Sequence, residues 1–364
     1  MQSSTDMAMN TDIAIKLSNV WKVFGQHAMM AYQAIQHENL SKADILSRYD
    51  AVLGVADVSL EVKKGEIFCI MGLSGSGKST LVRHFNRLLE PTAGQIEIDG
   101  TDVMALNAGE LQKFRNHKIG MVFQNFALMP HRSVLDNVAV PLEIRGVSKN
   151  ERMRQAAMIL EVVELGAWGS KFAHELSGGM QQRVGLARAL AANPDMLLMD
   201  EPFSALDPLI RRQLQDEFIR LSKILKKTTI FITHDLDEAV RVGNRIAIMR
   251  DGRVVQIGTA EEILMHPADD YVADFVAGIS RLKVVKARAI MQKKDEFMVN
   301  HGEFFHGDAL LDGAWVGDDA PLSDLVRLAI DHDRPILVRH DGKDIGVITR
   351  QDILRTVIEG ADIE

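Results

Sequence analysis

The chain has 364 residues, of which 46% are hydrophobic and 25% are charged, and its net charge is −8. This length predicts two or three domains, and the composition is that of a globular protein rather than a disordered one. The acidic balance argues against a protein that wraps nucleic acid.

The sequence carries no pattern of a membrane span or an export signal. No stretch reaches the 18 or more apolar residues of a spanning helix, and residues 1–12 do not combine a positive region with an apolar one. The single cysteine, Cys69, cannot form an internal disulfide, which favours the cytosol. Any role at a membrane therefore requires partner proteins.

Strands and helical segments are expected to alternate along most of the chain. Residues 26–52 are polar and helix-forming, with a capping box that begins at Ser41, and residues from about 106 to 180 predict a helical subdomain. The alternation indicates an α/β fold with a parallel sheet, whose functional groups lie at the carboxyl ends of the strands. Strands are predicted at 13–19, 58–62, 66–71, 196–199 and 228–233.

The pattern changes near residue 281. We predict a first domain over residues 1–280 and a small α+β domain over residues 281–364. In the second domain, Asp341-Gly342 between two apolar runs predicts a β-hairpin.

A glycine-rich segment from Gly72 to Ser79 matches G-x-x-x-x-G-K-[ST] in full, between a predicted strand and a predicted helix. The glycines let backbone N–H groups turn toward phosphates, Lys78 adds a positive charge, and the Ser79 hydroxyl suits Mg²⁺. The alternative is a glycine-rich loop that binds no ligand, and it does not explain why the full motif lies between a predicted strand and a predicted helix. The residues predicted to bind phosphates or Mg²⁺ here are Gly72, Ser74, Gly75, Ser76, Gly77, Lys78, Ser79 and Thr80.

Two acids follow the predicted strand at 196–199. Phosphoryl transfer needs one carboxylate in the Mg²⁺ shell and another that orients the attacking water. We assign Asp200 to the first role and Glu201 to the second, as general base. The alternative is a strand that ends in solvated acids.

The segment Leu176–Gln182 (LSGGMQQ) resembles the LSGGQ-type signature of ABC transporter ATPases. Three further segments continue the resemblance over residues 13–275. Gln124 resembles the family's Q-loop glutamine, Asp207 ends a segment similar to the D-loop, and His234 resembles the switch histidine.

The resemblance implies a P-loop NTPase fold, with a parallel-sheet core and a helical subdomain, that binds ATP and Mg²⁺ and hydrolyses ATP. Two copies would dimerise head to tail, with each ATP on the phosphate loop of one copy and under the signature of the other. Gln124 would join Ser79 and Asp200 at Mg²⁺, and His234 would contact the γ-phosphate. The residues that the resemblance adds to the ATP site are Gln124, Ser177, Gly178, Gly179, Asp207 and His234.

An aromatic residue commonly stacks on adenine in this family. Phe24 aligns best with that role, although it precedes Gly72 by more than is usual because the 26–52 segment is inserted. Trp21 is close enough to compete, so both residues stay candidates.

The insert at 26–52 and the segments around the phosphate loop are similar to those of glycine betaine/proline-type importer ATPases. The resemblance implies a subunit on the cytoplasmic face of the inner membrane, bound to a permease that a substrate-binding protein supplies. Residues 126–131 would receive a helix of the permease. Glycine betaine and proline betaine come first as solutes; trimethylamine N-oxide, choline, carnitine and histidine remain alternatives, as does a non-transport ABC ATPase.

The segment Gly346–Ile353 (GVITRQDI) resembles the end of a cystathionine-β-synthase-type (CBS) regulatory motif, in which the threonine and aspartate bind a ribose. Thr349 and Asp352 also fit a capping box that begins the last helix. We therefore expect a CBS-like domain that senses a nucleotide or ionic strength, and a remnant of a second motif at 286–291.

Overall fold

The computed structural model describes residues 12–38, 40–124, 126–301, 304–306, 309–310 and 314–358. It divides the chain into two compact units, of which one ends at Ile257 and the other begins at Gly258. Within the described residues, no helix combines the length and the apolar character that crossing a bilayer requires.

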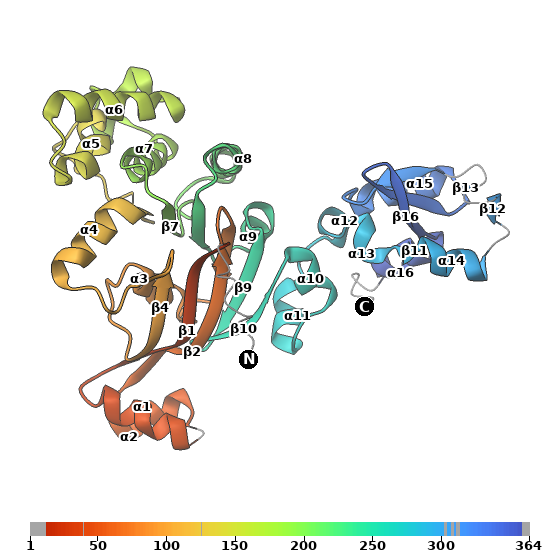
Figure 1. Ribbon diagram of the computed structural model, residues 1–364, viewed down its shortest axis with the longest axis horizontal. Coiled ribbons are helices and arrows are strands. Elements are labelled where there is room, and N and C mark those ends of the chain that lie inside the picture. Colours follow the sequence, from red (N-terminus) through yellow and green to blue (C-terminus); the bar gives the residue numbers. More distant parts are fainter. Residues whose placement is uncertain are drawn as a thin grey trace, which may run out of the picture. The chain divides into compact units, whose positions relative to one another are not determined.

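The first unit contains two sheets (Figure 1). The smaller is antiparallel, with strand order β2-β1-β4-β5. The larger has the order β10-β9-β3-β8-β7-β6, and its pairs from β9 to β6 are parallel, as the sequence predicts. The strands are β1 (Ile13–Phe24), β2 (Val52–Lys63), β3 (Ile67–Met71), β4 (Ala93–Ile98), β5 (Thr101–Asp102), β6 (Ile119–Val122), β7 (Met196–Asp200), β8 (Thr228–Ile232), β9 (Arg245–Arg250) and β10 (Arg253–Gly258).

The larger sheet is built from mostly apolar strands because both of its faces are buried. One face shares a core with the antiparallel sheet, since Ile15 and Val58 belong to the same cluster as Phe68 and Ile230. All five residues of β3 and all five of β8 are buried. The helices around this sheet are α3 (Lys78–Phe85), α4 (Ala108–Lys118), α8 (Pro208–Leu225) and α9 (Leu236–Val242).

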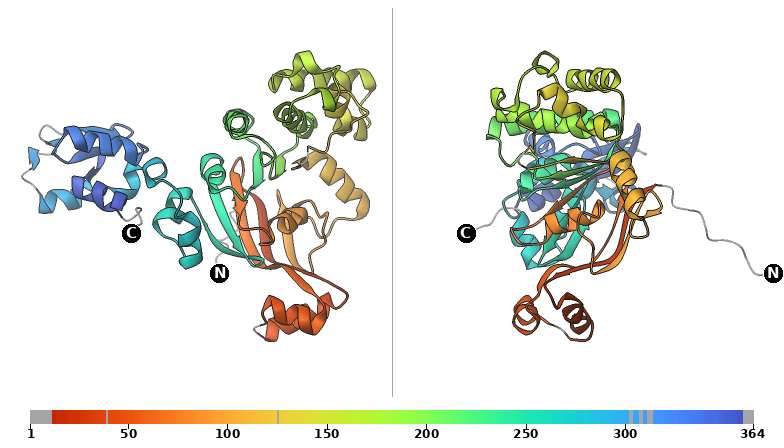
Figure 2. Two further views of the ribbon diagram at one scale, coloured as in Figure 1. Left: turned by 180° about the vertical axis from the view of Figure 1, so that it is seen from behind. Right: turned by 90° about the vertical axis from the view of Figure 1, so that its left-hand side faces the viewer.

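A helical subdomain with a core of its own stands beside this sheet (Figure 2). It consists of α5 (Val134–Ile144), α6 (Lys149–Val162) and α7 (Gly178–Ala191), with short 3₁₀ turns at Gly166–Trp168 and Ala173–Glu175. The expected interval of 106–180 also contains β6, which pairs with β7 in the main sheet. The helical part therefore begins after β6.

The insert between β1 and β2 is a pair of helices, α1 (Ala28–His37) and α2 (Lys42–Tyr49). The capping box at Ser41 and Asp44 is confirmed. Gly25, at the base of the insert, has φ = 121°, and a Cβ there would lie 2.5 Å from the Asp50 carbonyl oxygen, so only glycine fits. Trp21 and Ile45 belong to the small core that holds the two helices on the β1–β2 sheet.

The second unit contains a mixed sheet of order β11-β16-β15-β14. The predicted hairpin is confirmed, because β15 and β16 are antiparallel and the turn residues Asp341 and Gly342 have φ values of 46° and 76°. The elements are α10 (Ala260–Met265), α11 (Asp270–Val276), α12 (Arg281–Val284), α13 (Ala287–Ile290), β11 (Gln292–Lys293), α14 (Lys294–Asn300), β12 (Phe305–His306), β13 (Ala309–Leu310), β14 (Trp315–Gly317), α15 (Leu322–Asp331), β15 (Ile336–His340), β16 (Lys343–Ile348) and α16 (Arg350–Ile358).

Helices α10 and α11 lie in this second unit, although sequence analysis placed residues up to 280 in the first domain. Glu261 on α10 accepts a hydrogen bond from the Lys286 N–H (2.6 Å) and pairs with Arg288 (3.4 Å). These contacts join α10 to the C-terminal segment.

Candidate nucleotide-binding site

A cleft of about 710 Å³ lies where β3, β7 and β8 end. The phosphate loop follows β3, Glu201 follows β7, His234 follows β8 and Gln124 follows β6, so the cleft sits at the carboxyl ends of the parallel strands. It is lined by Phe24, Val52, Leu53, Gly54, Leu73, Ser74, Gly75, Gly77, Lys78, Ser79, Thr80, Gln124, Glu201 and His234.

Two glycines of the phosphate loop occupy positions that no other residue fits. Gly77 has φ = 103°, and a Cβ there would lie 2.4 Å from the Gly54 carbonyl oxygen. Gly72 has φ = 149°, and its Cβ would lie 2.2 Å from the Met249 carbonyl oxygen. The tight turn therefore depends on glycine, and it brings the backbone to the start of α3.

Lys78 is the first residue of α3 and is buried. Its Nζ donates hydrogen bonds to the carbonyl oxygens of Gly72 (2.8 Å) and Leu73 (3.0 Å) across the loop. Burial lowers the pKa of the Lys78 ammonium, and the negative charges of Glu201 and Asp200 oppose that shift. A bound phosphate would stabilise this cation, as the sequence-based assignment requires.

Ser79, which lines the cleft, lies beside Asp200, and its hydroxyl donates a hydrogen bond of 3.3 Å to the Asp200 carboxylate. Burial raises the pKa of Asp200, which the hydrogen bond from Ser79 and the positive charge of Arg83 oppose. A hydroxyl and a half-buried carboxylate side by side are the hard oxygen ligands that Mg²⁺ prefers, so the residues fit this ion.

Glu201 is held in a strained conformation with φ = 46°. Its N–H donates to the Ile232 carbonyl oxygen (3.0 Å), which ties the residue to the neighbouring strand. Its carboxylate accepts a hydrogen bond from Gln124 Nε2 (3.3 Å) and lies 3.0 Å from His234 Nδ1. The structure therefore brings together the three residues assigned to catalysis.

Of the two aromatic candidates for adenine, Phe24 lines the cleft and is 36% exposed. Trp21 is 6% exposed and packs edge-on against Tyr32, with 5.6 Å between ring centroids, inside the core of the insert. The geometry favours Phe24. Phe24 also pairs in register with Val52, and this pairing places Val52, Leu53 and Gly54 in the cleft lining, which sequence analysis missed.

The signature residues lie outside the lining of this cleft. Ser177 is the N-cap of α7, and its hydroxyl accepts a hydrogen bond from the Met180 N–H (3.4 Å). Asp207 caps α8 in the same way, with 3.1 Å to the N–H groups of Leu209 and Ile210. A Cβ on Gly179 would lie 2.6 Å from Ile210, which keeps the two helices close. One chain alone therefore does not bring Ser177, Gly178, Gly179 and Asp207 to its own phosphate loop.

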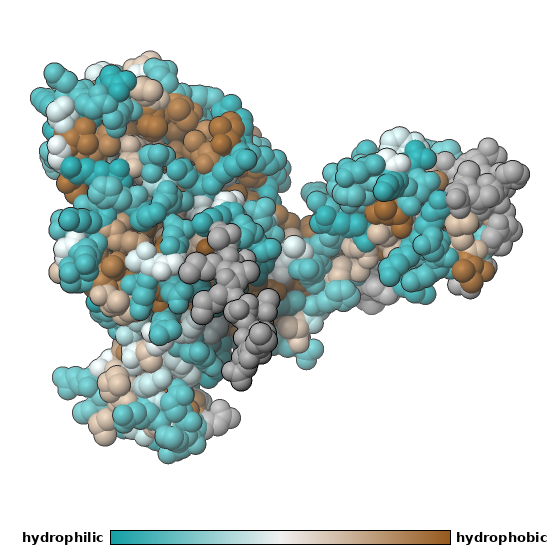
Figure 3. Space-filling model, in the orientation of Figure 1, coloured by the Kyte–Doolittle hydropathy of each residue, from teal (hydrophilic) through white to brown (hydrophobic). Residues whose placement is uncertain are grey.

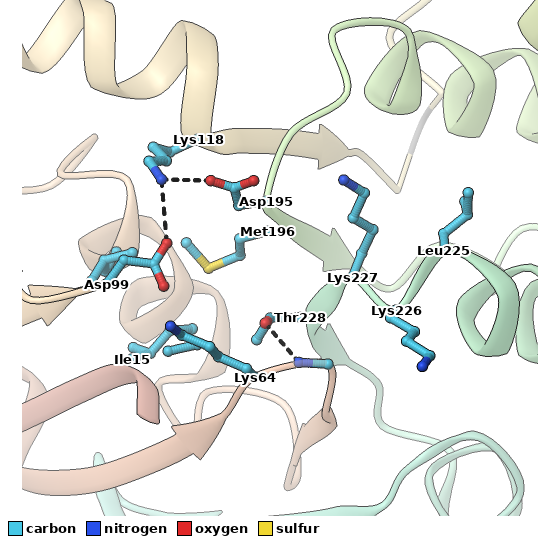
Figure 4. Close-up of a pocket in the computed structure, with 13 residues that line it drawn as sticks. Ile15, Lys64, Asp99, Lys118, Asp195, Met196, Leu225, Lys226, Lys227 and Thr228 are labelled. Carbon is cyan, nitrogen blue, oxygen red and sulfur yellow. Dashed lines mark hydrogen bonds and ion pairs between the residues drawn. The ribbon is translucent and has the colours of Figure 1, made fainter. Parts of the chain in front are cut away.

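A second pocket, of about 430 Å³, lies at the opposite ends of the strands (Figure 4). Its walls include Lys64, Lys226 and Lys227, and β7 and β8 begin beside it. Lys118 on α4 pairs there with Asp195 (2.5 Å) and Asp99 (3.5 Å). This pocket is separate from the phosphate loop and takes no part in the nucleotide site.

The fold and the cleft define a P-loop nucleotide hydrolase, with the phosphate loop, the two acids and the histidine at one edge of a parallel sheet. Comparison with known proteins narrows this class. The family model described as ABC transporter matches residues 55–204. The chain is 53% identical, over 281 residues, to the glycine betaine/proline betaine transport system ATP-binding protein of Escherichia coli strain K12, covering 77% of this chain and 70% of that one. The chain therefore belongs to the ABC transporter family of ATP-binding proteins, and it is an ATPase.

Two further comparisons extend this result. The trimethylamine N-oxide transport system ATP-binding protein of Ruegeria pomeroyi is 46% identical over 349 residues, which covers 95% of this chain and 98% of that one. A solved dimeric structure of a bacterial ABC transporter cassette matches with a TM-score of 0.56 and 36% identity, over 68% of this chain and 98% of that chain. The Ruegeria pomeroyi protein is thus similar over both units of this chain, whereas the match to the solved structure covers only 68% of it.

Proposed function

We propose that this chain is the motor subunit of an importer for a quaternary-amine-type solute. The cluster of Gln124, Glu201 and His234 beside a complete phosphate loop supports the motor role, and the solute class rests on the relatives. The chain is also 46% to 53% identical to relatives named for glycine betaine and trimethylamine N-oxide transport. Glycine betaine and proline betaine come first as solutes, and trimethylamine N-oxide follows.

The geometry supports a division of roles around the bound nucleotide. Lys78 and the loop N–H groups would hold the phosphates, and Ser79, Asp200 and Gln124 would hold Mg²⁺. When bound, this ion supplies charge neutralisation at the phosphates. Glu201 is placed to accept the proton of the attacking water, and His234 to donate a hydrogen bond to the γ-phosphate.

A second copy of the chain would complete the site. The signature residues Ser177–Gly179 stand at the N-terminus of α7, where a hydroxyl and free N–H groups favour an anion. Because they do not face their own phosphate loop, a head-to-tail partner would supply them to it. The solved cassette that this chain resembles is described as dimeric, which supports this arrangement.

The chain would lie on the cytoplasmic face of the inner membrane, where its helical subdomain would bind the permease. Apolar side chains gather on that subdomain (Figure 3). Two apolar residues of its helices, Ile144 on α5 and Met158 on α6, are 59% and 57% exposed. In the 126–131 segment, Phe126 and Ala127 have positive φ values (57° and 49°), and Arg188 fixes both carbonyl oxygens with hydrogen bonds of 2.8 and 2.5 Å. A segment shaped in this way suits contact with a partner helix.

Uptake of labelled glycine betaine by cells that express the intact transporter tests the solute class. We expect energy-dependent uptake that unlabelled quaternary amines suppress, with the strongest competitor naming the preferred solute. The competitors are trimethylamine N-oxide, choline, carnitine, proline and histidine. Absence of uptake of labelled betaine and of every competitor tested directly would contradict the quaternary-amine assignment and leave the ATPase in place.

We infer regulation by a nucleotide as a second function, located in the second unit. The element order strand–helix–hairpin occurs twice, as β11-α14-β12-β13 and as β14-α15-β15-β16, and β11 pairs with β16. This order supports two CBS-like motifs in one chain, with residues 286–291 leading into the shorter one. A pocket of about 380 Å³ beside them is lined by Thr349, Asp352 and Arg355, among others.

The capping box at Thr349 is confirmed, with the Asp352 carboxylate accepting hydrogen bonds from the Thr349 N–H (2.8 Å) and hydroxyl (2.7 Å). Asp352 also accepts from Gln292 Nε2 (3.1 Å), so it links the two motifs. The same geometry is therefore compatible with a capping box and with a ribose-binding motif at Thr349 and Asp352.

We expect a chain that carries Lys78→Ala, and so has a disabled phosphate loop, to retain weaker binding of a fluorescent ATP analogue. This residual binding should fall about tenfold when Arg355→Ala is added, because an exposed guanidinium that pairs with a phosphate is lost. Arg327→Ala on α15, another exposed arginine, is the control. Residual binding that Arg355→Ala leaves unchanged, or no residual binding, would contradict nucleotide sensing by this unit.

A further inference from the structure

The turn between β9 and β10 supports the phosphate loop from behind. The Gly252 N–H donates to the Ser76 carbonyl oxygen (2.9 Å), and the Gly252 carbonyl oxygen accepts from the Ala56 N–H (2.8 Å). A Cβ on Gly77 would lie 3.3 Å from the Gly252 Cα. The turn is therefore in direct contact with the loop, and any displacement of the turn would be transmitted to it.

The helical insert holds the same turn from the other side. Lys42, the first residue of α2, forms an ion pair with Asp251, with 2.9 Å from Nζ to Oδ1. The Arg253 guanidinium lies 5.6 Å from the centroid of the Trp21 ring, and Trp21 packs against Tyr32 on α1. The insert is thus joined directly to Asp251 through Lys42, and indirectly to Arg253 through Trp21 of β1.

The insert is also connected to the adenine side of the cleft. It begins directly after Phe24 and ends directly before Val52, and these two residues pair in register and line the cleft. The base of the insert is narrow, because Gly25 packs against the backbone at Asp50 and Ala51. The two strand ends that face the nucleotide are therefore fixed to the same small helical core.

We propose that the insert is a positioning element for ATP, and that Lys42 acts through Asp251 and Gly252 on the phosphate loop. Lys42 touches no nucleotide; it holds the turn whose N–H group fixes the Ser76 carbonyl oxygen. When this ion pair is lost, the loop becomes less ordered before ATP arrives. The loop must then become ordered when ATP binds, which weakens the affinity for nucleotide. The hydrolysis rate of bound ATP, kcat, stays the same.

The expected effect is modest because both partners are partly solvated. The side chains of Lys42 and Asp251 are 38% and 65% exposed, and ion pairs of this kind have small energies. We therefore expect Lys42→Met to weaken ATP binding by about two- to five-fold. Adding Arg253→Met, which also removes the contact with Trp21, is expected to bring the loss to about tenfold.

The test compares Lys42→Met with Lys42→Arg, which keeps the charge, and with Arg48→Met. Arg48 pairs with Glu38 at the same distance of 2.9 Å but within the insert, away from the turn. Affinity for a fluorescent ATP analogue is measured at equilibrium, together with KM and kcat for hydrolysis and the thermal unfolding midpoint.

The proposal predicts that Lys42→Met raises Kd and KM in parallel, with kcat and the unfolding midpoint unchanged, and that Lys42→Arg and Arg48→Met behave like the wild type. An equal loss of affinity in Lys42→Met and Arg48→Met would overturn it, since the effect would then come from the stability of the insert. Unchanged affinity in the Lys42→Met/Arg253→Met chain would also overturn it. The ATPase assignment is unaffected by either outcome, because the wild type is measured alongside.

Discussion

Replacing Glu201 with glutamine is expected to abolish ATP hydrolysis and to leave ATP binding intact. Glutamine has nearly the same shape, but its amide does not take the proton from the attacking water. Loss of a general base lowers the rate by about 10²- to 10⁴-fold. Glu201 is not among the groups that hold the phosphate loop, so the affinity for ATP should stay within about twofold of the wild type.

The same substitution should trap a dimer with ATP enclosed, because the closed state forms and its exit by hydrolysis is blocked. Steady-state phosphate release and size-exclusion chromatography with ATP and Mg²⁺ measure the two effects. Glu61→Gln, at an exposed acid on β2 that pairs with Lys16, is the matched control. Hydrolysis at the wild-type rate in Glu201→Gln would remove Glu201 as the base.

Replacing Lys78 with alanine is expected to cost most of the affinity for ATP. A hydrogen bond to a charged group contributes about 1.5 to 3 kcal/mol, which corresponds to a loss of about ten- to a hundred-fold. Lys78 also bridges the carbonyl oxygens of Gly72 and Leu73, so the empty loop should become less ordered too.

Equilibrium titration with a fluorescent ATP analogue measures the loss. Lys64→Ala removes a lysine from the pocket at the opposite ends of the strands, and it controls for the change in net charge. Lys78→Arg keeps the positive charge but changes the shape of the side chain, so it shows how much of the ATP affinity depends on charge alone. ATP binding that is unchanged in Lys78→Ala would contradict the assignment of the phosphate loop.

The residues of the site that follow strands were predictable from sequence, because each lies in a short segment whose chemistry is local. Gly72–Ser79 needs glycine where φ is positive, and Asp200 and Glu201 follow an apolar run of strand length. These groups meet because parallel strands end at one edge of a sheet. Sequence analysis therefore assigned Lys78 and Glu201 to one site without knowledge of distances, and in the structure both line one cleft.

Other features depend on contacts between segments that are far apart in the chain, and sequence patterns do not report them. The pairing of Phe24 with Val52, which places β2 in the cleft lining, spans the whole insert. The strand β6 is only four residues long and lies among helices. It is therefore too short for a strand pattern of apolar residues to be recognised in the sequence. The contacts of α10 with Lys286 and Arg288 likewise appear only in three dimensions.

The most direct test of the account is uptake of labelled glycine betaine by cells that express the intact transporter with either the wild-type chain or Glu201→Gln. Equal amounts of the two chains at the membrane are verified in the same cells. The account predicts accumulation with the wild-type chain and none above background with Glu201→Gln. Accumulation that is the same with both chains would contradict the claim that ATP hydrolysis at this site drives import.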